Sequence, residues 1–192
     1  PYNDLAAVEA LVAAEGETLA AIIVEPMAGN MGLVEPAAGF LTGLRNATAQ
    51  CGALLIFDEV ISGFRLGPTT YGELCGITPD LTTLGKIIGG GMPLGAVGGR
   101  QAIMSELAPL GRVYQAGTLS GNPVAVAAGL AMLDLLVREN PYEQLAALGE
   151  RLAQELSGAA AEAGITMRCA QRGGAFTPFF GIEEVPQNLA QV

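Results

Sequence analysis

The feature that most constrains the fold is a pair of short, uninterrupted apolar runs separated by one helical segment. The runs are LAAIIV at 19–24 and ALLIF at 53–57. Continuous apolar runs of this length are typical of buried strands in a parallel sheet. Between them, residues 39–51 repeat apolar side chains at helical spacing and are followed by Gly52, a common helix stop. Strand, helix and strand in this order predict a βαβ unit with a right-handed crossover.

Further helices and strands are expected on both sides of this unit. The remaining expected elements are helices at 4–15, 101–107, 123–138 and 142–163, strands at 81–84 and in the LGAV stretch of 89–99, β-structure across 165–181, and irregular chain at 60–80. The alternation predicts an α/β fold with a mostly parallel sheet. A boundary is expected near Asn140-Pro141, which divides the chain into one domain at 1–139 and the beginning of a second at 140–192.

Composition excludes several classes of function. The chain has 19 acidic and 9 basic residues and a net charge of −10, so we expect neither a nucleic-acid partner nor a membrane surface. No apolar stretch reaches the roughly 18 residues that a membrane-spanning helix needs. The absence of histidine removes Ser-His-Asp and Cys-His catalysis and histidine-ligated zinc, and we expect no metal site.

The cysteines and the ends of the chain bear on its location. Cys51, Cys75 and Cys169 are odd in number and widely spaced, which favours a reducing cytoplasm over a disulfide framework. The first residues, PYNDLAAVEA, contain no basic region of the kind that opens a signal peptide. Neither end carries a recognisable closing element, so we expect the chain to be a fragment of a longer protein.

Lys86 is the only lysine in the sequence, and it lies between a short apolar strand and a glycine-rich turn. A lysine enclosed at such a position would be desolvated, and desolvation favours the neutral, nucleophilic amine. The typical use of such an amine is an imine with a carbonyl cofactor. The alternative interpretation is a solvated surface lysine beside a turn, and the residues alone leave both open.

Asp58 follows the apolar run at 53–57, so its carboxylate is expected at the carboxyl edge of the sheet, where α/β folds bind ligands. A carboxylate there is costly unless it meets a positive partner. It could cap the turn that follows, or it could face a protonated ring nitrogen. A pyridoxal-phosphate enzyme needs both a lysine for the aldehyde and an acid for the ring nitrogen.

Three segments resemble the class III pyridoxal-phosphate aminotransferases. They are FDEVISGFR at 57–65, TPDLTTLGKIIGGGMPLGAVGG at 78–99 and YQAGTLSGNPVA at 114–125, and VEPMAGNMGLVEP at 24–36 supports them. The motifs are specific because Asp-Glu-Val, Gly-Lys and Gly-Thr occur in the order and spacing of that family. The second and third segments are most similar to its glutamate-1-semialdehyde 2,1-aminomutase branch, more than to acetylornithine or 4-aminobutyrate transaminases.

The resemblance implies a role for each matching residue. Lys86 would bind the cofactor covalently and then move a proton between cofactor and substrate carbons. Asp58 would pair with the pyridine nitrogen, and Val60 would press on one face of the ring. Gly117 and Thr118 would bind the phosphate of the cofactor held by the neighbouring subunit. Without the resemblance, we would expect Val60 to be a residue of the hydrophobic core and the Gly-Thr pair to form an ordinary turn.

Three more residues are implied near the substrate. Glu25 and Asn30 would lie near the phenolic oxygen of the cofactor and the substrate, although Glu25 alone could simply end a strand. Tyr114 would lie at the dimer interface or the substrate entrance. The family's upstream phosphate loop, ring-stacking aromatic residue and gating loop have no counterpart in these residues.

The resemblance also implies a fold, a cofactor and an activity. The fold would be that of type I pyridoxal-phosphate enzymes, with part of a large α/β domain and the start of a small α+β domain, in a homodimer with the site at the subunit interface. The substrate would be a small amino-aldehyde, glutamate-1-semialdehyde, which is converted to the tetrapyrrole precursor 5-aminolevulinate while the cofactor passes through its pyridoxamine form. The alternatives are a class III ω-aminotransferase that acts on an amine donor and a keto acid, and a non-catalytic fragment.

Overall fold

The computed structural model describes residues 1–192, and most of the expected elements are present in it. The helices are α1 (Leu5–Glu15), α2 (Phe40–Cys51), α3 (Tyr71–Cys75), α4 (Gln101–Met104), α5 (Pro123–Glu139) and α6 (Tyr142–Glu162). The strands are β1 (Ala21–Val24), β2 (Leu54–Glu59), β3 (Leu81–Leu84), β4 (Ala96–Gly99), β5 (Met167–Arg172) and β6 (Ala175–Phe180). None of the helices has the length and apolar character needed to cross a membrane.

Residues with strong capping preferences fix the ends of the longer helices. The Asp4 carboxylate accepts the Ala7 N–H at the start of α1. Asn122 caps α5 in the same way, and Pro123 occupies its first turn, where a missing N–H costs nothing. Gly52 ends α2 with a φ of 78°, in the left-handed region that glycine adopts without strain.

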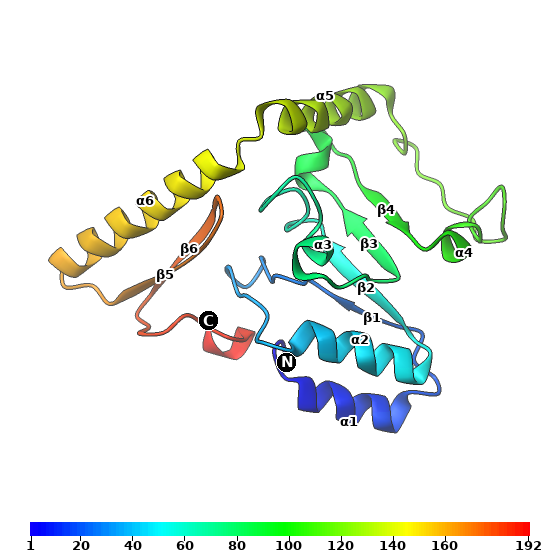
Figure 1. Ribbon diagram of the computed structural model, residues 1–192, viewed down its shortest axis with the longest axis horizontal. Helices are drawn as coiled ribbons and strands as arrows, with labels where there is room; N and C mark the ends of the chain where they lie inside the picture. The colour runs from blue at the N-terminus through cyan, green and yellow to red at the C-terminus, as the bar shows by residue number, and fades with distance from the viewer.

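The four strands β1 to β4 form one sheet in sequence order (Figure 1). β1 pairs with β2 and β2 with β3 in parallel, whereas β4 runs antiparallel to β3. The predicted βαβ unit and the mostly parallel sheet are therefore confirmed. The register places Asp58 of β2 opposite Thr83 of β3, and Thr83 opposite Val97 of β4.

One face of this sheet is covered and the other is open. α2 packs against β1 and β2, and α1 packs on α2 (Figure 1). Along β2, the buried residues Leu55 and Phe57 alternate with the half-buried Ile56 and Asp58. The prediction of a buried strand is wrong for β1, whose residues are half-buried or exposed, with Ile23 62% exposed, because no helix of this chain packs on the second face. No residue of β2 is exposed.

Two short elements differ from expectation. Residues 60–80 contain the helix α3, which is too short to produce a helical period and so was expected to be irregular. Thr70 caps its first turn by accepting the Glu73 N–H. The helix expected at 101–107 is limited to the four residues of α4.

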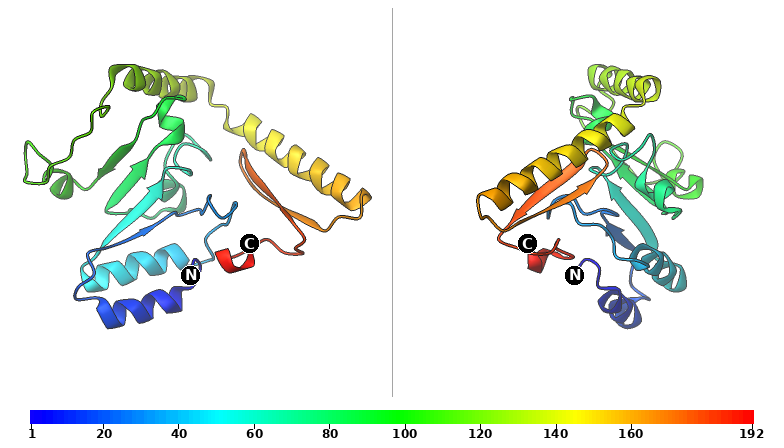
Figure 2. Two further views of the ribbon diagram at one scale, coloured as in Figure 1. Left: turned by 180° about the vertical axis from the view of Figure 1, so that it is seen from behind. Right: turned by 60° about the vertical axis from the view of Figure 1, so that its left-hand side comes forward.

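The C-terminal residues form a helix packed on a β-hairpin. Asn140, with a φ of 40°, separates α5 from α6, and α6 then lies along the antiparallel pair β5–β6 (Figure 2). This change of direction falls at the predicted boundary between 1–139 and 140–192. The main buried cluster nevertheless contains Phe179 of β6 together with Met27 and Leu33, so the hairpin shares a core with the chain that follows β1. The division into two domains stays a prediction.

Candidate functional site

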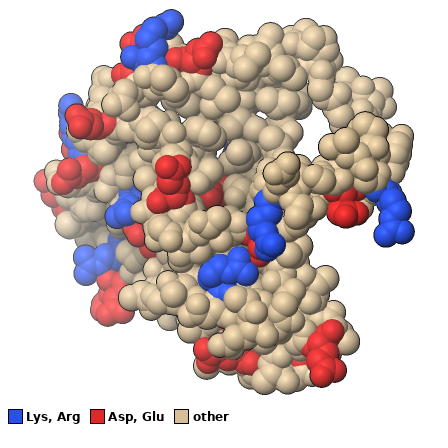
Figure 3. Space-filling model, turned by 45° about the vertical axis from the view of Figure 1, so that its right-hand side comes forward, with Lys and Arg blue, Asp and Glu red and all other residues tan.

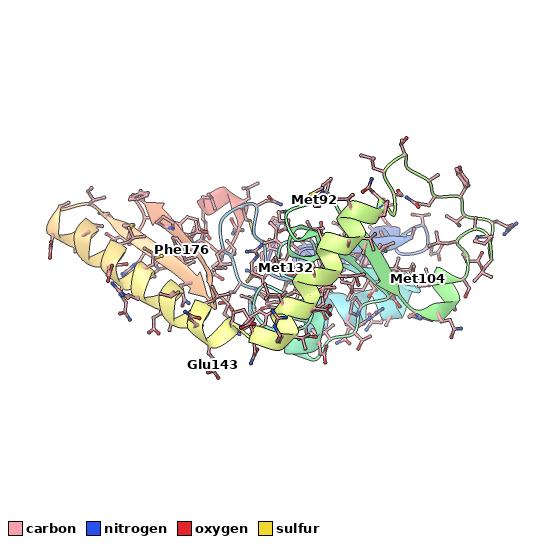
Figure 4. All side chains as sticks on the ribbon, turned by 90° about the horizontal axis from the view of Figure 1, so that it is seen from above. Met92, Met104, Met132, Glu143 and Phe176 are labelled. Carbon is pink, nitrogen blue, oxygen red and sulfur yellow. The ribbon has the colours of Figure 1, made fainter.

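The parallel pairing of β2 and β3 brings the two principal candidate residues to one edge of the sheet. Asp58 is the second-last residue of β2, and Lys86 follows the last residue of β3 after Gly85. Because parallel strands end at the same edge, the carboxylate and the amine belong to neighbouring strand ends. α5, on which Met132 is labelled in Figure 4, packs against the short 3₁₀ turn Lys86–Gly89 that begins there.

Asp58 offers one free oxygen to a ligand. Its Oδ1 accepts the Val60 N–H at 3.1 Å and the Thr83 hydroxyl at 3.1 Å. No hydrogen bond within the chain reaches Oδ2. The bond from Val60 fits the turn-capping interpretation, while the free Oδ2 fits the pairing with a protonated ring nitrogen. Thr83 was not among the residues predicted from the sequence, because only the strand register shows that it faces Asp58.

The neighbouring acid Glu59 has a different place. It lies on the covered face with no exposed surface, where it accepts the Gly72 N–H at 3.0 Å and also the Tyr71 N–H and the Ser62 hydroxyl. Burial raises the pKa of this carboxyl above its usual range, and the hydrogen bonds from Gly72, Tyr71 and Ser62 oppose that shift. Glu59 therefore joins β2 to α3 and is separated from the open face, as the alternation of side chains along a strand requires.

The backbone of Lys86 has an unusual conformation. Its φ of 46° is in the left-handed region, which is unfavourable for a residue with a side chain and is found at functional sites. A Cβ at the preceding Gly85 would lie 3.2 Å from Val60 Cγ1, so Val60 packs directly against the backbone that leads to the lysine. The side chain of Lys86 is exposed, which differs from the enclosed lysine expected, because the open face of the sheet carries no covering helix.

This backbone conformation predicts a difference between two variants that both lack the amine. We expect Lys86→Gly to be more stable than Lys86→Ala by about 1 kcal/mol, because glycine adopts a positive φ without the steric cost that alanine retains. Urea unfolding of the two variants measures the difference. Equal midpoints would show that the turn relaxes to a negative φ once the lysine side chain is removed.

A cavity of about 710 Å³ opens beside these strand ends, on the open face of the sheet. Its lining includes Thr83, Leu94, Gln115, Gly117 and Ser120. A Cβ at Gly117 would lie 2.7 Å from Ser120 Oγ, so a larger residue there would require the Ser120 side chain to rotate. Thr118 is exposed and makes no side-chain hydrogen bond within the chain. Its predicted contact with a phosphate of a neighbouring subunit stays a prediction.

Glu25 and Asn30 are brought together in the loop after β1. Glu25 Oε2 accepts the Gly29 N–H at 2.8 Å, and Oε1 accepts the Asn30 side-chain amide at 3.1 Å. The far side of this loop is held by the hairpin, because the Leu33 N–H donates to Thr177 Oγ1 at 3.2 Å. Glu25 thus shapes the loop that carries Asn30, and the roles of both residues toward a ligand stay predictions.

Tyr114 lies at the surface, and the charged side chains are dispersed. Tyr114 is 82% exposed and belongs to a segment with other exposed apolar side chains. On the face drawn in Figure 3, acidic and basic side chains are scattered around a broad uncharged area, with no continuous basic patch.

The sequence of the chain is similar to those of known proteins over nearly its whole length. The family model described as aminotransferase class-III matches residues 2–187. The chain is 56% identical over 191 residues to a glutamate-1-semialdehyde 2,1-aminomutase of Bordetella avium, with 100% of this chain and 44% of that protein covered. It is 55% identical over 184 residues to the enzyme of that name from Pelotomaculum thermopropionicum, with 96% and 42% covered. The chain thus spans less than half the length of the curated relatives it matches.

Solved structures agree with the sequence matches. A β-phenylalanine aminotransferase from Variovorax paradoxus superimposes with a TM-score of 0.89 at 37% identity, covering 99% of this chain and 44% of that one. A glutamate-1-semialdehyde aminomutase from Pseudomonas aeruginosa, in complex with PMP, gives a TM-score of 0.84 at 31% identity, covering 98% and 43%. Both similarities extend from the sheet through the C-terminal hairpin.

Proposed function

Since this chain belongs to the class-III aminotransferase family, we propose that it supplies the lysine-bearing part of a pyridoxal-phosphate enzyme that converts glutamate-1-semialdehyde into 5-aminolevulinate. The observation that carries the choice of reaction is the 54–57% identity to four curated aminomutases. The strand register supports it, because Asp58 and Lys86 belong to adjacent strand ends.

The residues present fit this cofactor. Asp58 has an oxygen, Oδ2, that no group of the chain occupies, and the chain contains a single lysine. A Cβ at Gly85 would lie 3.2 Å from Val60 Cγ1, so Val60 packs closely against the backbone beside the lysine. The ring of the cofactor would lie next to Val60 at these strand ends.

When bound, pyridoxal phosphate supplies an electron sink for the substrate carbon and a carrier for the amino group. The chain's own residues hold the cofactor and move protons. Lys86 would hold the cofactor through Nζ and, with that amine free, would carry a proton between two carbons at the site. Asp58, through its unoccupied Oδ2, would keep the ring nitrogen protonated. Gly117 and Thr118 offer N–H and hydroxyl donors to a phosphate.

A homodimer in the cytoplasm is part of this proposal. Lys86 is exposed in the single chain, and several large apolar side chains beyond β4 are exposed as well. In the segment between α4 and α5, Leu110, Tyr114 and Leu119 are 83%, 82% and 64% exposed. A second copy that covers this region would enclose the lysine and bring its own Thr118 toward the first copy's cofactor. The three cysteines are free, which is consistent with a reducing compartment.

A second function is favoured by one observation. The β-phenylalanine aminotransferase and an ω-transaminase from Sphaerobacter thermophilus superimpose with TM-scores of 0.89 and 0.87, against 0.84 for the aminomutase of Pseudomonas aeruginosa. An ω-aminotransferase would transfer the amino group from an amine donor to a keto acid. Parallel assays for 5-aminolevulinate and for amine-donor turnover distinguish the two reactions, and amine transfer without 5-aminolevulinate would favour this second function.

The covalent site is tested by labelling. We expect pyridoxal phosphate, mixed with the protein and then reduced with borohydride, to appear by peptide mass spectrometry on Lys86. The visible absorbance band before reduction should survive desalting and should be absent in Lys86→Ala. The same labelling on the full-length protein decides the alternative, because this chain lacks the family's upstream phosphate loop. Full-length protein that takes up no label on Lys86 would contradict the assignment and would favour a non-catalytic role.

A further inference from the structure

Thr83 is the residue of β3 whose Cα lies opposite Asp58 in the parallel register. Register partners on adjacent strands point to the same face of the sheet, and here the Thr83 hydroxyl donates to Asp58 Oδ1 at 3.1 Å. We propose that Thr83 is a positioning residue that orients the Asp58 carboxylate toward the ring nitrogen of the cofactor. The proposal rests on the function proposed above.

The two donors to Asp58 act on one oxygen and come from different elements. The Val60 N–H lies 3.1 Å from Oδ1 and belongs to the loop directly after β2. The Thr83 hydroxyl reaches the same Oδ1 from the next strand. A carboxylate with both bonds on one oxygen has a fixed plane, and its second oxygen points away from the donors. The arrangement leaves Oδ2 as the oxygen that can accept from a ligand.

Thr83 is suited to this role by its side chain and its surroundings. A β-branched side chain has few χ1 rotamers, so the hydroxyl starts from a restricted position. Its backbone is held on both sides, by Asp58 of β2 and by Val97 of β4. Val60, in contrast, belongs to the turn that begins after β2. The bond from Thr83 therefore ties the carboxylate to the sheet itself.

Thr83 also lines the cavity of about 710 Å³ beside the strand ends. Gly117, from the turn predicted to bind the phosphate of the neighbouring subunit's cofactor, lines the same cavity. Thr83 therefore borders a space that a ligand could enter and also contacts the Asp58 carboxylate through its hydroxyl. Thr83 therefore affects the orientation of the Asp58 carboxylate and not the packing of the covered face.

The adjacent Thr82 provides a matched control. It has the same side chain, belongs to the same strand and is also half-buried. Because successive side chains of a strand alternate, Thr82 points to the other face, and its hydroxyl makes no hydrogen bond within the chain. Thr82→Val and Thr83→Val remove the same atom, and only the second removes the contact with Asp58.

The test compares wild type, Thr83→Val, Thr83→Ser and Thr82→Val in the whole protein. The first readout is the dissociation constant of pyridoxal phosphate, from titration of the visible band. We expect Thr83→Val to bind about tenfold more weakly, which corresponds to about 1.4 kcal/mol. The second readout is the pH at which the cofactor's ring nitrogen loses its proton, followed by NMR with nitrogen-15 in the ring. That midpoint should fall by about one pH unit in Thr83→Val.

The controls separate positioning from packing. Thr83→Ser keeps a hydroxyl and should restore both readouts to within about twofold of wild type, and Thr82→Val should leave them unchanged. If Thr83→Val lowers the unfolding temperature but leaves the ring-nitrogen midpoint in place, Thr83 is structural and the inference is wrong. If wild type takes up no pyridoxal phosphate on Lys86, the proposed function itself fails, and this outcome is distinct from equal behaviour of wild type and Thr83→Val.

Discussion

Replacing Lys86 with alanine is expected to lower the formation of 5-aminolevulinate by at least about 10²–10⁴-fold, the range of a lost proton-transfer group. The loss of covalent binding adds to this effect, because no other lysine of the chain can take over. The fold should persist, since the Lys86 side chain is exposed and makes no hydrogen bond or ion pair. The loss would therefore be one of chemistry rather than of stability.

The measurement uses an enzyme with a known reaction as the host. These 192 residues replace the matching region of the Bordetella avium aminomutase, to which they are 56% identical over 191 residues. The graft should form 5-aminolevulinate, and the graft with Lys86→Ala should not. Lys86→Arg is the matched control, because it keeps the positive charge but has no amine that can lose its proton. Activity in Lys86→Arg would contradict a covalent role.

Asp80→Ala is expected to destabilise the protein by roughly 3–5 kcal/mol, the usual cost of removing one partner from a buried ion pair. Asp80 is 3% exposed and accepts the Leu55 N–H at 2.8 Å, Arg45 at 2.8 Å and Arg100 at 2.7 Å. These groups come from β2, from α2 and from the end of β4. Without the carboxylate, the Leu55 N–H and the partly buried Arg45 lose their partner, whereas the more exposed Arg100 can turn to water.

Urea unfolding measures this effect, and an exposed ion pair provides the control. Glu155 pairs with Arg151 one turn away on α6, and both side chains are mostly exposed. Glu155→Ala should change the free energy of unfolding by less than about 0.5 kcal/mol, because water replaces an exposed partner at little cost. Similar losses in the two variants would show that Asp80 is not the junction that its contacts indicate.

The pH dependence of the same carboxyl gives an independent readout. Burial alone raises the pKa of Asp80, but the hydrogen bonds from Leu55, Arg100 and Arg45 outweigh it and bring the pKa to about 2, below its ordinary value of 3.8. A depressed folded-state pKa adds stability that is complete above pH 3.8 and is lost as the pH falls toward 2. Wild type should lose this part of its stability over that window, and Asp80→Ala should lack the corresponding loss.

The local elements could largely be predicted from the sequence. The strand at 81–84, the helix start at Pro123 and the helix stop at Gly52 are confirmed, because each depends on residues within a few positions. The exposure of one face of β1 could not be predicted from its apolar run, because the covering of that face depends on elements elsewhere in the chain. Ile23 shows this, being apolar and yet exposed.

The same distinction between local and long-range features applies to the residues of the site. Asp58 and Lys86 could be proposed as site residues because each stands at a strand end in a motif of consecutive residues. Thr83 and Asp80 were missed, because their contacts depend on the register between strands and on partners 20 or more positions away. The placement of Asp58 and Glu59 on opposite faces of the sheet could have been predicted, because successive side chains of a strand alternate between faces.

The contact between the loop after β1 and the C-terminal hairpin has a consequence for synthesis of the chain on the ribosome. Gly32, with a φ of 89°, lies so close to Phe179 that a Cβ would overlap its ring, and Leu33 donates to Thr177, which lies 144 positions later. At translation rates of about 5–20 residues per second, the hairpin is made roughly 7–29 s after the loop. The loop that carries Asn30 thus acquires its neighbour well after the residues of β1, β2 and β3 have been made.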